Sequence, residues 1–439
     1  MSSSKLVDRE APVQGALVIH PDREGRDGAR HPEARLEEAV GLALALDLEV
    51  REAMVVGLRK LTPATLFGRG KVDEIATLVE VEELDVVVVD DALTPVQQRN
   101  LEKAWKAKVI DRTGLILEIF ARRARTREGR LQVELARLTY ERSRLVRTWT
   151  HLERQRGGFG VMGGPGETQI ETDRRLIAEK IGKLKRELTE VRRTRTLQRS
   201  ARRRVPFPSV ALVGYTNAGK STLFNRITKA DVLAQDMLFA TLDPTLRSLK
   251  LPDGRAAILS DTVGFISDLP HELVEAFRAT LEEVREADVV LHVRDIASEE
   301  SNAQAADVRA VLERLGLDMD ERRILEVWNK VDLLPEEERA TIEGDARRAQ
   351  PPAVPVSAVT GEGTDLLLAT IAGLVDEAPP VEIHAPAGEG AAIAWLYRHG
   401  RVIERETAED GSVTMAVSLT AQALGQFEQL FPQAEIRAD

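Results

Sequence analysis

The 439-residue chain contains no cysteine. Disulfide bonds, zinc–thiolate sites and thiol catalysis are therefore excluded. The sequence also lacks an apolar run long enough to cross a membrane, and its first residues, Met1–Asp8, lack the apolar core of a secretion signal. With 43% hydrophobic and 30% charged residues, we expect a soluble, globular, cytoplasmic protein without a membrane span. Its length suggests roughly two to four domains.

Negative charge outweighs positive charge overall, but positive charge is concentrated in one segment. The net charge is −11, yet residues 121–204 contain 24 Lys and Arg against 10 Asp and Glu, a local excess of +14. A basic segment in an acidic protein favours a polyanionic partner, most simply nucleic acid. The other interpretation is a solvated helical surface.

One stretch, Pro208–Thr222, joins an apolar run to a glycine loop and the start of a helix. Gly214, Gly219, Lys220 and Ser221 match the phosphate-loop pattern G-x-x-x-x-G-K-[ST]. The glycines let successive backbone N–H groups face phosphate oxygens, and the helix N-terminus adds its positive end. Lys220 would place its ammonium group on the β- and γ-phosphates, and Ser221 would offer its hydroxyl to Mg2+. The stretch therefore predicts a nucleoside triphosphate site.

A second motif follows about 40 residues later. The apolar segment 256–261 ends in Asp261, and Gly264 comes three residues after it. Such an aspartate approaches Mg2+ through a water molecule, while the glycine N–H meets the γ-phosphate. Between the two motifs, Thr241 is our candidate for the second hydroxyl ligand of Mg2+, and Thr245 is its rival.

Base recognition is predicted at Asn329–Asp332 and at the end of a final strand expected at Val354–Ala358. The Asp332 carboxylate can accept hydrogen bonds from the N1–H and 2-amino groups of guanine, both of which adenine lacks. Lys330 can lie over the base, and Ser357 and Ala358 can close on its O6. The order of the motifs, each at an expected strand end, indicates one doubly wound sheet with its ligand at the carboxyl ends of the strands.

These motifs yield a set of expected site residues. Lys220, Thr241 and Gly264 are expected to be catalytic, and Ser221, Thr241 and (through water) Asp261 to hold Mg2+. A K+ ion beside Asn217 is a further hypothesis. The full nucleotide-binding set is Gly214, Tyr215, Thr216, Asn217, Ala218, Gly219, Lys220, Ser221, Thr222, Phe239, Ala240, Thr241, Leu242, Asp243, Asp261, Thr262, Val263, Gly264, Asn329, Lys330, Val331, Asp332, Ser357, Ala358 and Val359.

The fold class expected is α/β, in four segments. Residues 1–124 should form an N-terminal α/β domain, 125–204 a basic antiparallel helical (coiled-coil) hairpin with a glycine-rich tip loop, 205–375 a phosphate-loop GTPase domain with a doubly wound sheet, and 376–439 a small C-terminal α/β domain. In the first, strands are expected at 16–19, 85–90 and 108–111 and helices at 31–46 and 94–106. Phe67–Glu74 is either a structural turn, which we favour, or an anion-binding turn.

The hairpin prediction rests on two heptad seams. Seam positions from Leu131 to Leu152 and from Ile177 to Val191 recur at alternating spacings of four and three, and all are apolar except Arg142, whose charge needs a partner or water. Six of the ten residues in the intervening segment Gly157–Gly166 are glycine. We expect a probe that orders inside a partner's cavity, the alternative being a flexible linker. Its expected binding residues are Gly157, Gly158, Phe159, Gly160, Val161, Met162, Gly163 and Gly164.

From about residue 15 to its C-terminus, the sequence resembles the HflX family of translation-associated GTPases. The resemblance is carried by residues 67–71, 109–117, 148–154, 239–245 and 261–265, and most specifically by Gly164–Gln169 followed by Asp173–Arg175. It implies a monomeric GTPase that binds GTP, GDP and the 23S rRNA of the large (50S) ribosomal subunit. It also implies splitting or rescue of stalled ribosomes, with the hairpin tip reaching toward the peptidyl-transferase region.

Two features separate this chain from related proteins. Many members of that family have an arginine just before Gly-Pro-Gly, whereas residues Met162–Gly164 of this chain include no arginine. Phe265 follows Gly264, where Ras-like GTPases place a water-orienting glutamine, so we expect slow intrinsic hydrolysis stimulated by a partner. Two other functions stay open: a nucleotide-gated module that controls a protein partner, and a helper in tRNA modification.

Overall fold

The computed structural model describes most of the chain. The described residues are 14–23, 30–155, 165–202, 207–229, 238–239, 242, 245–268, 282–314, 316, 323–375, 380–408, 410–419 and 421–437. The chain divides into two compact units. One runs to residue 365 without residues 251–255, and the other consists of those five residues and the chain from residue 366.

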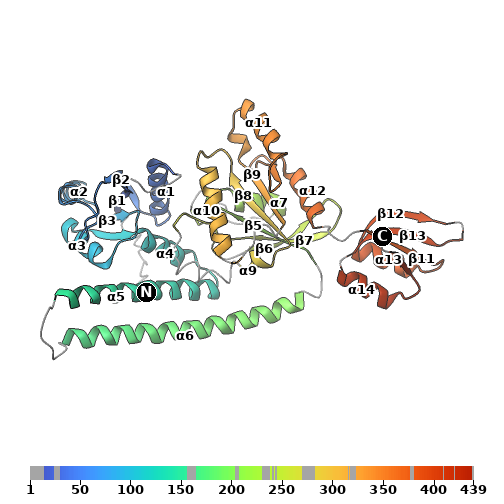
Figure 1. The fold of residues 1–439 in the computed structure, drawn as a ribbon, viewed down its shortest axis with the longest axis horizontal. Helices are drawn as coiled ribbons and strands as arrows, with labels where there is room; N and C mark the ends of the chain where they lie inside the picture. Colours follow the sequence, from blue (N-terminus) through green and yellow to red (C-terminus); the bar gives the residue numbers. More distant parts are fainter. Residues whose placement is uncertain are drawn as a thin grey trace, which may run out of the picture. The chain divides into compact units, whose positions relative to one another are not determined.

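The N-terminal part of the first unit is a four-stranded parallel sheet with strand order β2-β1-β3-β4 (Figure 1). Its elements are β1 (Gly15–Arg23), α1 (Pro32–Leu44), β2 (Glu49–Leu58), α2 (Arg69–Val81), β3 (Val86–Val89), α3 (Pro95–Trp105), β4 (Lys108–Asp111) and α4 (Arg112–Arg123). The three predicted strands and both predicted helices are confirmed.

Two features of this sheet differ from the sequence-based expectation. Strand β2 was not predicted, because Glu49, Arg51 and Glu52 interrupt its apolar pattern at the edge of the sheet. The predicted turn at residues 67–74 is instead mostly helical: Gly68 is the N-cap of α2. By contrast, α3 begins as expected, with Thr94 and Gln97 forming a reciprocal capping box before Pro95.

Two long helices follow, α5 (Arg127–Gln155) and α6 (Pro165–Arg202), and they pack against each other. In Figure 1 they run side by side. Val133 and Ala136 of α5 are buried in the core that α4 contributes to, while Ile181 and Leu188 are buried on α6. The predicted helical hairpin is therefore present. Its tip, Gly157–Gly164, lies outside the described residues.

A six-stranded sheet with order β10-β9-β8-β5-β7-β6 completes the first unit, and only its edge strand β6 is antiparallel. Its strands are β5 (Ser209–Gly214), β6 (Thr245–Lys250), β7 (Ala256–Asp261), β8 (Val289–Asp295), β9 (Arg323–Asn329) and β10 (Ala353–Pro355). The helices are α7 (Lys220–Thr228), α9 (Glu282–Glu286), α10 (Ser301–Arg314), the 3-10 turn η1 (Val331–Leu333) and α11 (Glu336–Ala346). Helix α12 (Thr364–Leu374) begins at the end of the first unit and otherwise belongs to the second. Gly214, Asp261 and Asn329 all end parallel strands, so they share one edge of the sheet.

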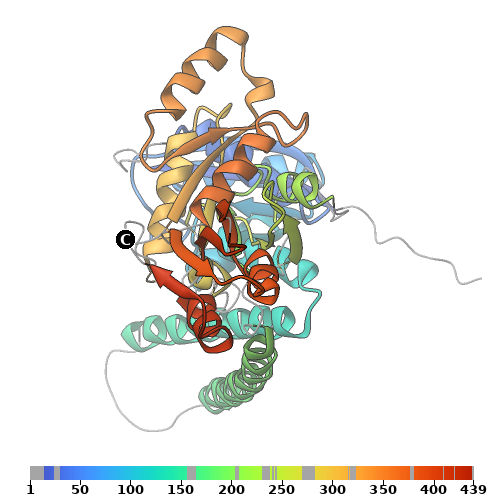
Figure 2. The ribbon, with the colours of Figure 1, turned by 90° about the vertical axis from the view of Figure 1, so that its right-hand side faces the viewer.

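The second unit contains an antiparallel sheet with order β12-β13-β11-β14, drawn in orange to red in Figure 2. Its elements are β11 (Pro380–Ala385), α13 (Gly390–His399), β12 (Arg401–Thr407), β13 (Val413–Ser418), α14 (Ala421–Leu430) and β14 (Glu435–Arg437). Leu396 and Phe427 share one core with Ile383 and Met415, so both helices pack on the same face of the sheet.

None of the helices in the described ranges is both long enough and apolar enough to span a membrane.

Candidate nucleotide site

The phosphate loop has a backbone that only glycine allows at its two ends. Gly214 has φ +154°, and a Cβ there would lie 2.2 Å from the Val293 carbonyl oxygen. Gly219 has φ +87°, and its Cβ would lie 2.2 Å from Asn329 Nδ2. Any side chain at either position would therefore collide with a neighbouring strand or with the base-recognition motif.

Lys220 begins α7 and is buried, with 6% of its surface exposed. Its Nζ donates a hydrogen bond to the Tyr215 carbonyl oxygen at 2.6 Å, across the loop. Burial lowers the pKa of this ammonium group to about 8, and the nearby Asp261 carboxylate partly opposes that shift. A buried ammonium group inside a loop of N–H donors is suited to an anionic phosphate.

Ser221 and Asp261 meet beneath this loop. The Ser221 hydroxyl donates to Asp261 Oδ2 at 2.8 Å, and Asp261 is fully buried at the end of β7. A hydroxyl and a carboxylate are the oxygen ligands that Mg2+ prefers, with phosphates and water completing its shell. Among the described residues, no group of three or more His, Cys, Asp or Glu side chains could hold a metal ion. These residues therefore fit a magnesium ion that arrives with its nucleotide.

The segment after Asp261 lies against the phosphate loop. The Phe265 N–H donates to the Gly214 carbonyl at 3.1 Å, and the Thr216 N–H donates to the Phe265 carbonyl at 2.7 Å. A Cβ on Gly264 would lie 2.9 Å from Thr216 Cγ2 and 3.1 Å from Lys220 Nζ. Gly264 is thus placed beside the lysine, as a residue that senses a γ-phosphate must be.

The base-recognition segments are tied to the phosphate loop through Asn329. Its Nδ2 donates to the Ala218 carbonyl at 2.8 Å, and its Oδ1 accepts from the Ala358 N–H at 3.0 Å. Lys330 pairs with Asp295 at 2.7 Å. The strand expected to reach Ala358 is shorter, since β10 ends at Pro355, and Ser357 and Ala358 lie in the following loop.

Several expected site residues point elsewhere. Phe239, Leu242 and Val263 are buried among hydrophobic side chains, so only their backbones are available to a nucleotide. Ala240, Thr241 and Asp243 lie outside the described residues. Thr245, the rival to Thr241, begins β6 directly opposite Asp261 in the antiparallel register. The choice between the two threonines therefore stays a prediction.

Sequence reasoning missed a polar contact between the phosphate loop and the N-terminal sheet. The Tyr215 hydroxyl donates to Glu38 of α1 and accepts from the Ser267 N–H at 2.8 Å and from Arg30 Nη1 at 2.9 Å. Burial and the Glu38 carboxylate raise the pKa of this hydroxyl, which keeps it a donor. The sequence predicted Tyr215 only as a phosphate-loop residue, and its distant partners lie in no recognisable motif.

Arg112 strengthens the same contact from α4. Its Nη2 donates to the Ser267 carbonyl at 2.9 Å and hydroxyl at 3.0 Å, and its Nη1 pairs with Asp90 at 2.5 Å. Burial alone would lower the pKa of this guanidinium, but the Asp90 and Glu38 carboxylates raise it. The residues just after Gly264 are therefore held by two side chains of the N-terminal part.

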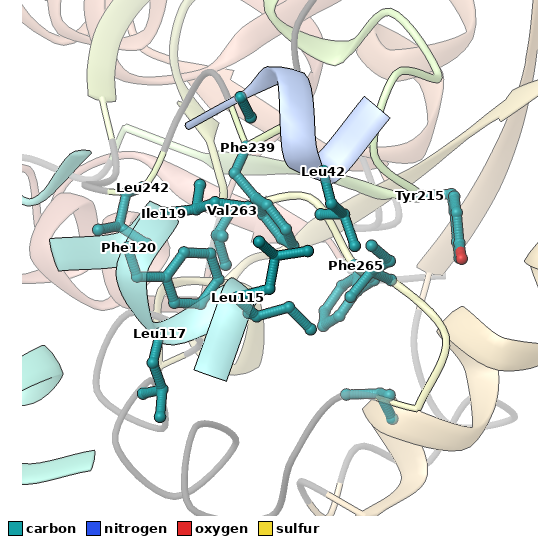
Figure 3. Close-up of a cluster of buried hydrophobic side chains, with 14 of the residues drawn as sticks. Leu42, Leu115, Leu117, Ile119, Phe120, Tyr215, Phe239, Leu242, Val263 and Phe265 are labelled. Atoms are coloured by element: carbon teal, nitrogen blue, oxygen red, sulfur yellow. The ribbon is translucent and has the colours of Figure 1, made fainter. Parts of the chain in front are cut away.

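A hydrophobic cluster lies beside this polar contact (Figure 3). Phe120 of α4 meets Phe239 edge to face, with ring centroids 4.6 Å apart at 86°. Leu42 and Leu115 of the N-terminal part and Phe265 of the GTPase part belong to the same buried cluster. Both segments that flank the expected magnesium site thus pack on the N-terminal part.

The fold and the site define a phosphate-loop GTPase. Four family models match the chain: GTP-binding GTPase N-terminal at residues 33–121, GTP-binding GTPase Middle Region at 123–202, 50S ribosome-binding GTPase at 209–330 and HflX C-terminal domain at 345–436. The chain belongs to the ribosome-associated HflX family of GTPases. As a member of that family, it is a GTP hydrolase.

Two relatives of high sequence identity agree with this assignment, and one solved structure is also similar. GTPase HflX of Magnetococcus marinus is 53% identical over 394 residues, which are 90% of each chain. GTPase HflX of Escherichia coli K12 is 46% identical over 420 residues, covering 94% of this chain and 95% of that one. A GTP-binding protein from Sulfolobus solfataricus, solved with GDP, is 24% identical and covers 83% of this chain and 99% of its own, with a TM-score of 0.45.

Proposed function

We propose that this GTPase binds the large ribosomal subunit and splits or rescues stalled ribosomes. The observation that carries the proposal is the basic hairpin attached to the nucleotide site. On α6 the side chains of Arg174, Arg175, Lys183, Lys185 and Arg186 are all exposed. Exposed cations along one long helix suit the phosphate backbone of 23S rRNA, and the match to the 50S ribosome-binding family model supports the same partner.

In the proposed hydrolysis step, Ser221, Thr241 and (through water) Asp261 hold Mg2+, which neutralises charge on the phosphates when it is bound. Lys220 binds the β- and γ-phosphates, and the Gly264 N–H contacts the γ-phosphate. Phe265 is 1% exposed and is packed in the hydrophobic cluster, so it cannot orient an attacking water. Hydrolysis by the protein alone should therefore be slow and should rise when the large subunit binds.

A potassium ion beside Asn217 would add positive charge near the phosphates. Asn217 has a left-handed backbone, with φ +61°, inside the phosphate loop. Intrinsic turnover should then be faster in KCl than in NaCl at equal ionic strength. Equal rates would contradict the potassium proposal and leave the magnesium site unaffected.

We further propose that the protein acts as a monomer in the cytoplasm, where ribosomes and GTP are available.

The decisive experiment measures GTP turnover with and without purified 50S subunits. The chain and a variant with residues 157–166 replaced by a short Gly-Ser linker are compared. Strong stimulation that weakens in the variant supports a tip that probes the ribosome. Undiminished stimulation of the variant would assign ribosome binding to the GTPase part and the helices. If 50S subunits do not stimulate turnover of either protein, a nucleotide-gated module acting on a protein partner would be favoured.

Splitting itself needs a separate readout. Stalled 70S ribosomes mixed with the protein and GTP should separate into subunits on a sucrose gradient, and GDP should not support the reaction. Intact 70S particles under both conditions would contradict the splitting proposal even if 50S subunits stimulate turnover.

A further inference from the structure

A single arginine joins the phosphate-binding helix to the loop expected to contact the base. Arg226 stands in the last turn of α7, the helix that Lys220 begins. Its Nε donates to the Ala358 carbonyl at 3.1 Å, and its Nη2 donates to the Val359 carbonyl. One planar guanidinium thus bonds two successive backbone carbonyls, which fixes the orientation of both peptide groups.

The rest of this loop is closed by its own hydrogen bonds. The Thr360 N–H donates to the Ser357 hydroxyl at 3.0 Å, and the Gly361 N–H donates to the Ser357 carbonyl at 2.8 Å. Gly361 has φ +93°, a conformation that favours glycine. The Ala358 N–H is directed to Asn329 Oδ1. These bonds restrain the loop, and Arg226 adds bonds to the Ala358 and Val359 carbonyls.

The direction of one donor follows from planar geometry. In a trans peptide the N–H points opposite to the preceding C=O. Because Arg226 draws the Ala358 carbonyl toward α7, the Val359 N–H must point away from α7. Val359 exposes 67% of its surface, so the loop is open to solvent at this residue. Guanine offers an acceptor at its position 6, whereas adenine offers an amino donor, so a fixed N–H discriminates between the two bases.

We propose that Arg226 is a positioning residue for guanine: it aims the Val359 N–H at the base O6 and so adds to the preference for guanine that Asp332 provides. The proposal rests on the proposed nucleotide site but goes beyond it, because Arg226 would act through the backbone carbonyls that it binds. It also links the two halves of the ligand, since the helix that begins at the phosphates ends on the base loop.

The test is a double-mutant cycle between Arg226 and the base O6. Binding of GDP and of 2-aminopurine riboside 5′-diphosphate, a fluorescent analogue that lacks O6 and the N1–H but keeps the 2-amino group, is measured for the intact chain and for Arg226→Gln. Arg226→Gln should weaken GDP binding roughly fivefold, the value of about one hydrogen bond. It should change binding of the analogue by less than about twofold, because the analogue has no O6 to lose.

Two further variants sharpen the cycle. Arg226→Lys keeps the charge but cannot bond both carbonyls in a fixed fork, so its loss for GDP should fall between those of the chain and Arg226→Gln. Arg247→Gln, in an exposed arginine on β6, is the matched control and should bind both nucleotides like the unaltered chain.

Equal losses for GDP and the analogue would show that Arg226 only supports the fold of the site, and this would overturn the proposal. Unchanged GDP binding by Arg226→Gln would overturn it as well. Failure of the unaltered chain to bind GDP would refute the proposed nucleotide site instead, so the two failures can be told apart.

Discussion

At the scale of single residues, side chains outside the motifs decide how the nucleotide site is held. Tyr215 belongs to the phosphate loop by sequence, yet its hydroxyl contacts Glu38 and Ser267 instead of facing the phosphates. Arg112 binds the same serine. The phosphate loop and the residues after Gly264 therefore share buried partners, so a substitution in one segment should change the stability of the other.

The first prediction concerns this hydroxyl. Tyr215→Phe removes the acceptor of the Ser267 N–H and one of several hydrogen bonds to Glu38, which should cost about 1–3 kcal/mol. Amide hydrogen exchange across residues 264–268 should become faster by the corresponding factor. Tyr397→Phe, in a tyrosine that is 54% exposed, is the control and should leave that exchange unchanged. Equal protection in Tyr215→Phe would mean that the hydroxyl contributes nothing to the segment.

The second prediction concerns pH. His292 on β8 is 1% exposed, and burial lowers the pKa of its ring to about 4. Glu326 opposes that shift, while Arg294, Arg309 and Lys220 add to it. Since the unfolded chain binds a proton near pH 6.5 and the folded chain does not, stability present above pH 6.5 is lost as the pH falls toward 4. The loss should reach about 3 kcal/mol.

Nuclear magnetic resonance of ring-labelled histidines can measure this directly. The His292 signal, identified by its absence in His292→Gln, should stay at its neutral position down to about pH 5. His292→Gln should also lose less stability between pH 6.5 and 4 than the unaltered chain. The control is His31→Gln, at an exposed position. A His292 signal that titrates near pH 6.5 would show that the ring is not isolated in the core.

At the scale of elements, α4 connects three parts of the molecule. Asp111 caps it by accepting from the Gly114 N–H at 2.8 Å, and it also accepts from the Tyr140 hydroxyl of α5 at 2.8 Å. Arg144 of α5 pairs with the same carboxylate at 3.2 Å. One end of α4 thus fixes the hairpin, and its apolar face, through Phe120, packs on the GTPase part.

The third prediction tests that apolar face. Phe120→Ala removes a buried ring and its contact with Phe239, which should lower the free energy of unfolding by about 3–5 kcal/mol. Urea unfolding followed by circular dichroism would measure the loss. Phe207→Ala, in a phenylalanine that is 48% exposed, removes the same atoms and should cost about 1 kcal/mol or less. Similar losses in both variants would argue against a packed junction at Phe120.

At the scale of the whole molecule, charge is divided between a basic hairpin and an acidic remainder. Residues 121–204 carry an excess of +14 within a chain of net charge −11. The acidic remainder should repel rRNA, so productive contact should run through the hairpin. This division gives binding a strong and local dependence on salt.

The fourth prediction follows from that division. Replacing Arg174, Arg175, Lys183 and Arg186 with glutamine should lower the slope of log affinity for 50S subunits against log salt by about 3 to 4. Filter binding across a series of KCl concentrations measures the slope. The matched control neutralises four exposed cations elsewhere, namely Arg59, Lys60, Arg347 and Arg348. If both sets change the slope equally, the hairpin is not the rRNA-binding surface.

The sequence by itself determined the features that depend on local chemistry and order. The phosphate loop follows from glycines that alone accept its backbone, the strand ends follow from apolar runs, and the hairpin follows from its heptads. The missed strand β2 shows the limit, because its polar residues at a sheet edge resemble a loop. Thr241 and the hairpin tip stay predictions.

Packing in three dimensions selects the distant residues that support the site. Glu38 and Arg226 belong to no motif, and the segment around Arg112 says nothing of its contacts. Each of the three is more than a hundred residues from the site residue that it binds. Their roles depend on packing that brings α1, α4 and α7 against loops far along the chain. A local pattern records the geometry of a few neighbouring residues, whereas a buried contact depends on how the whole chain closes around it.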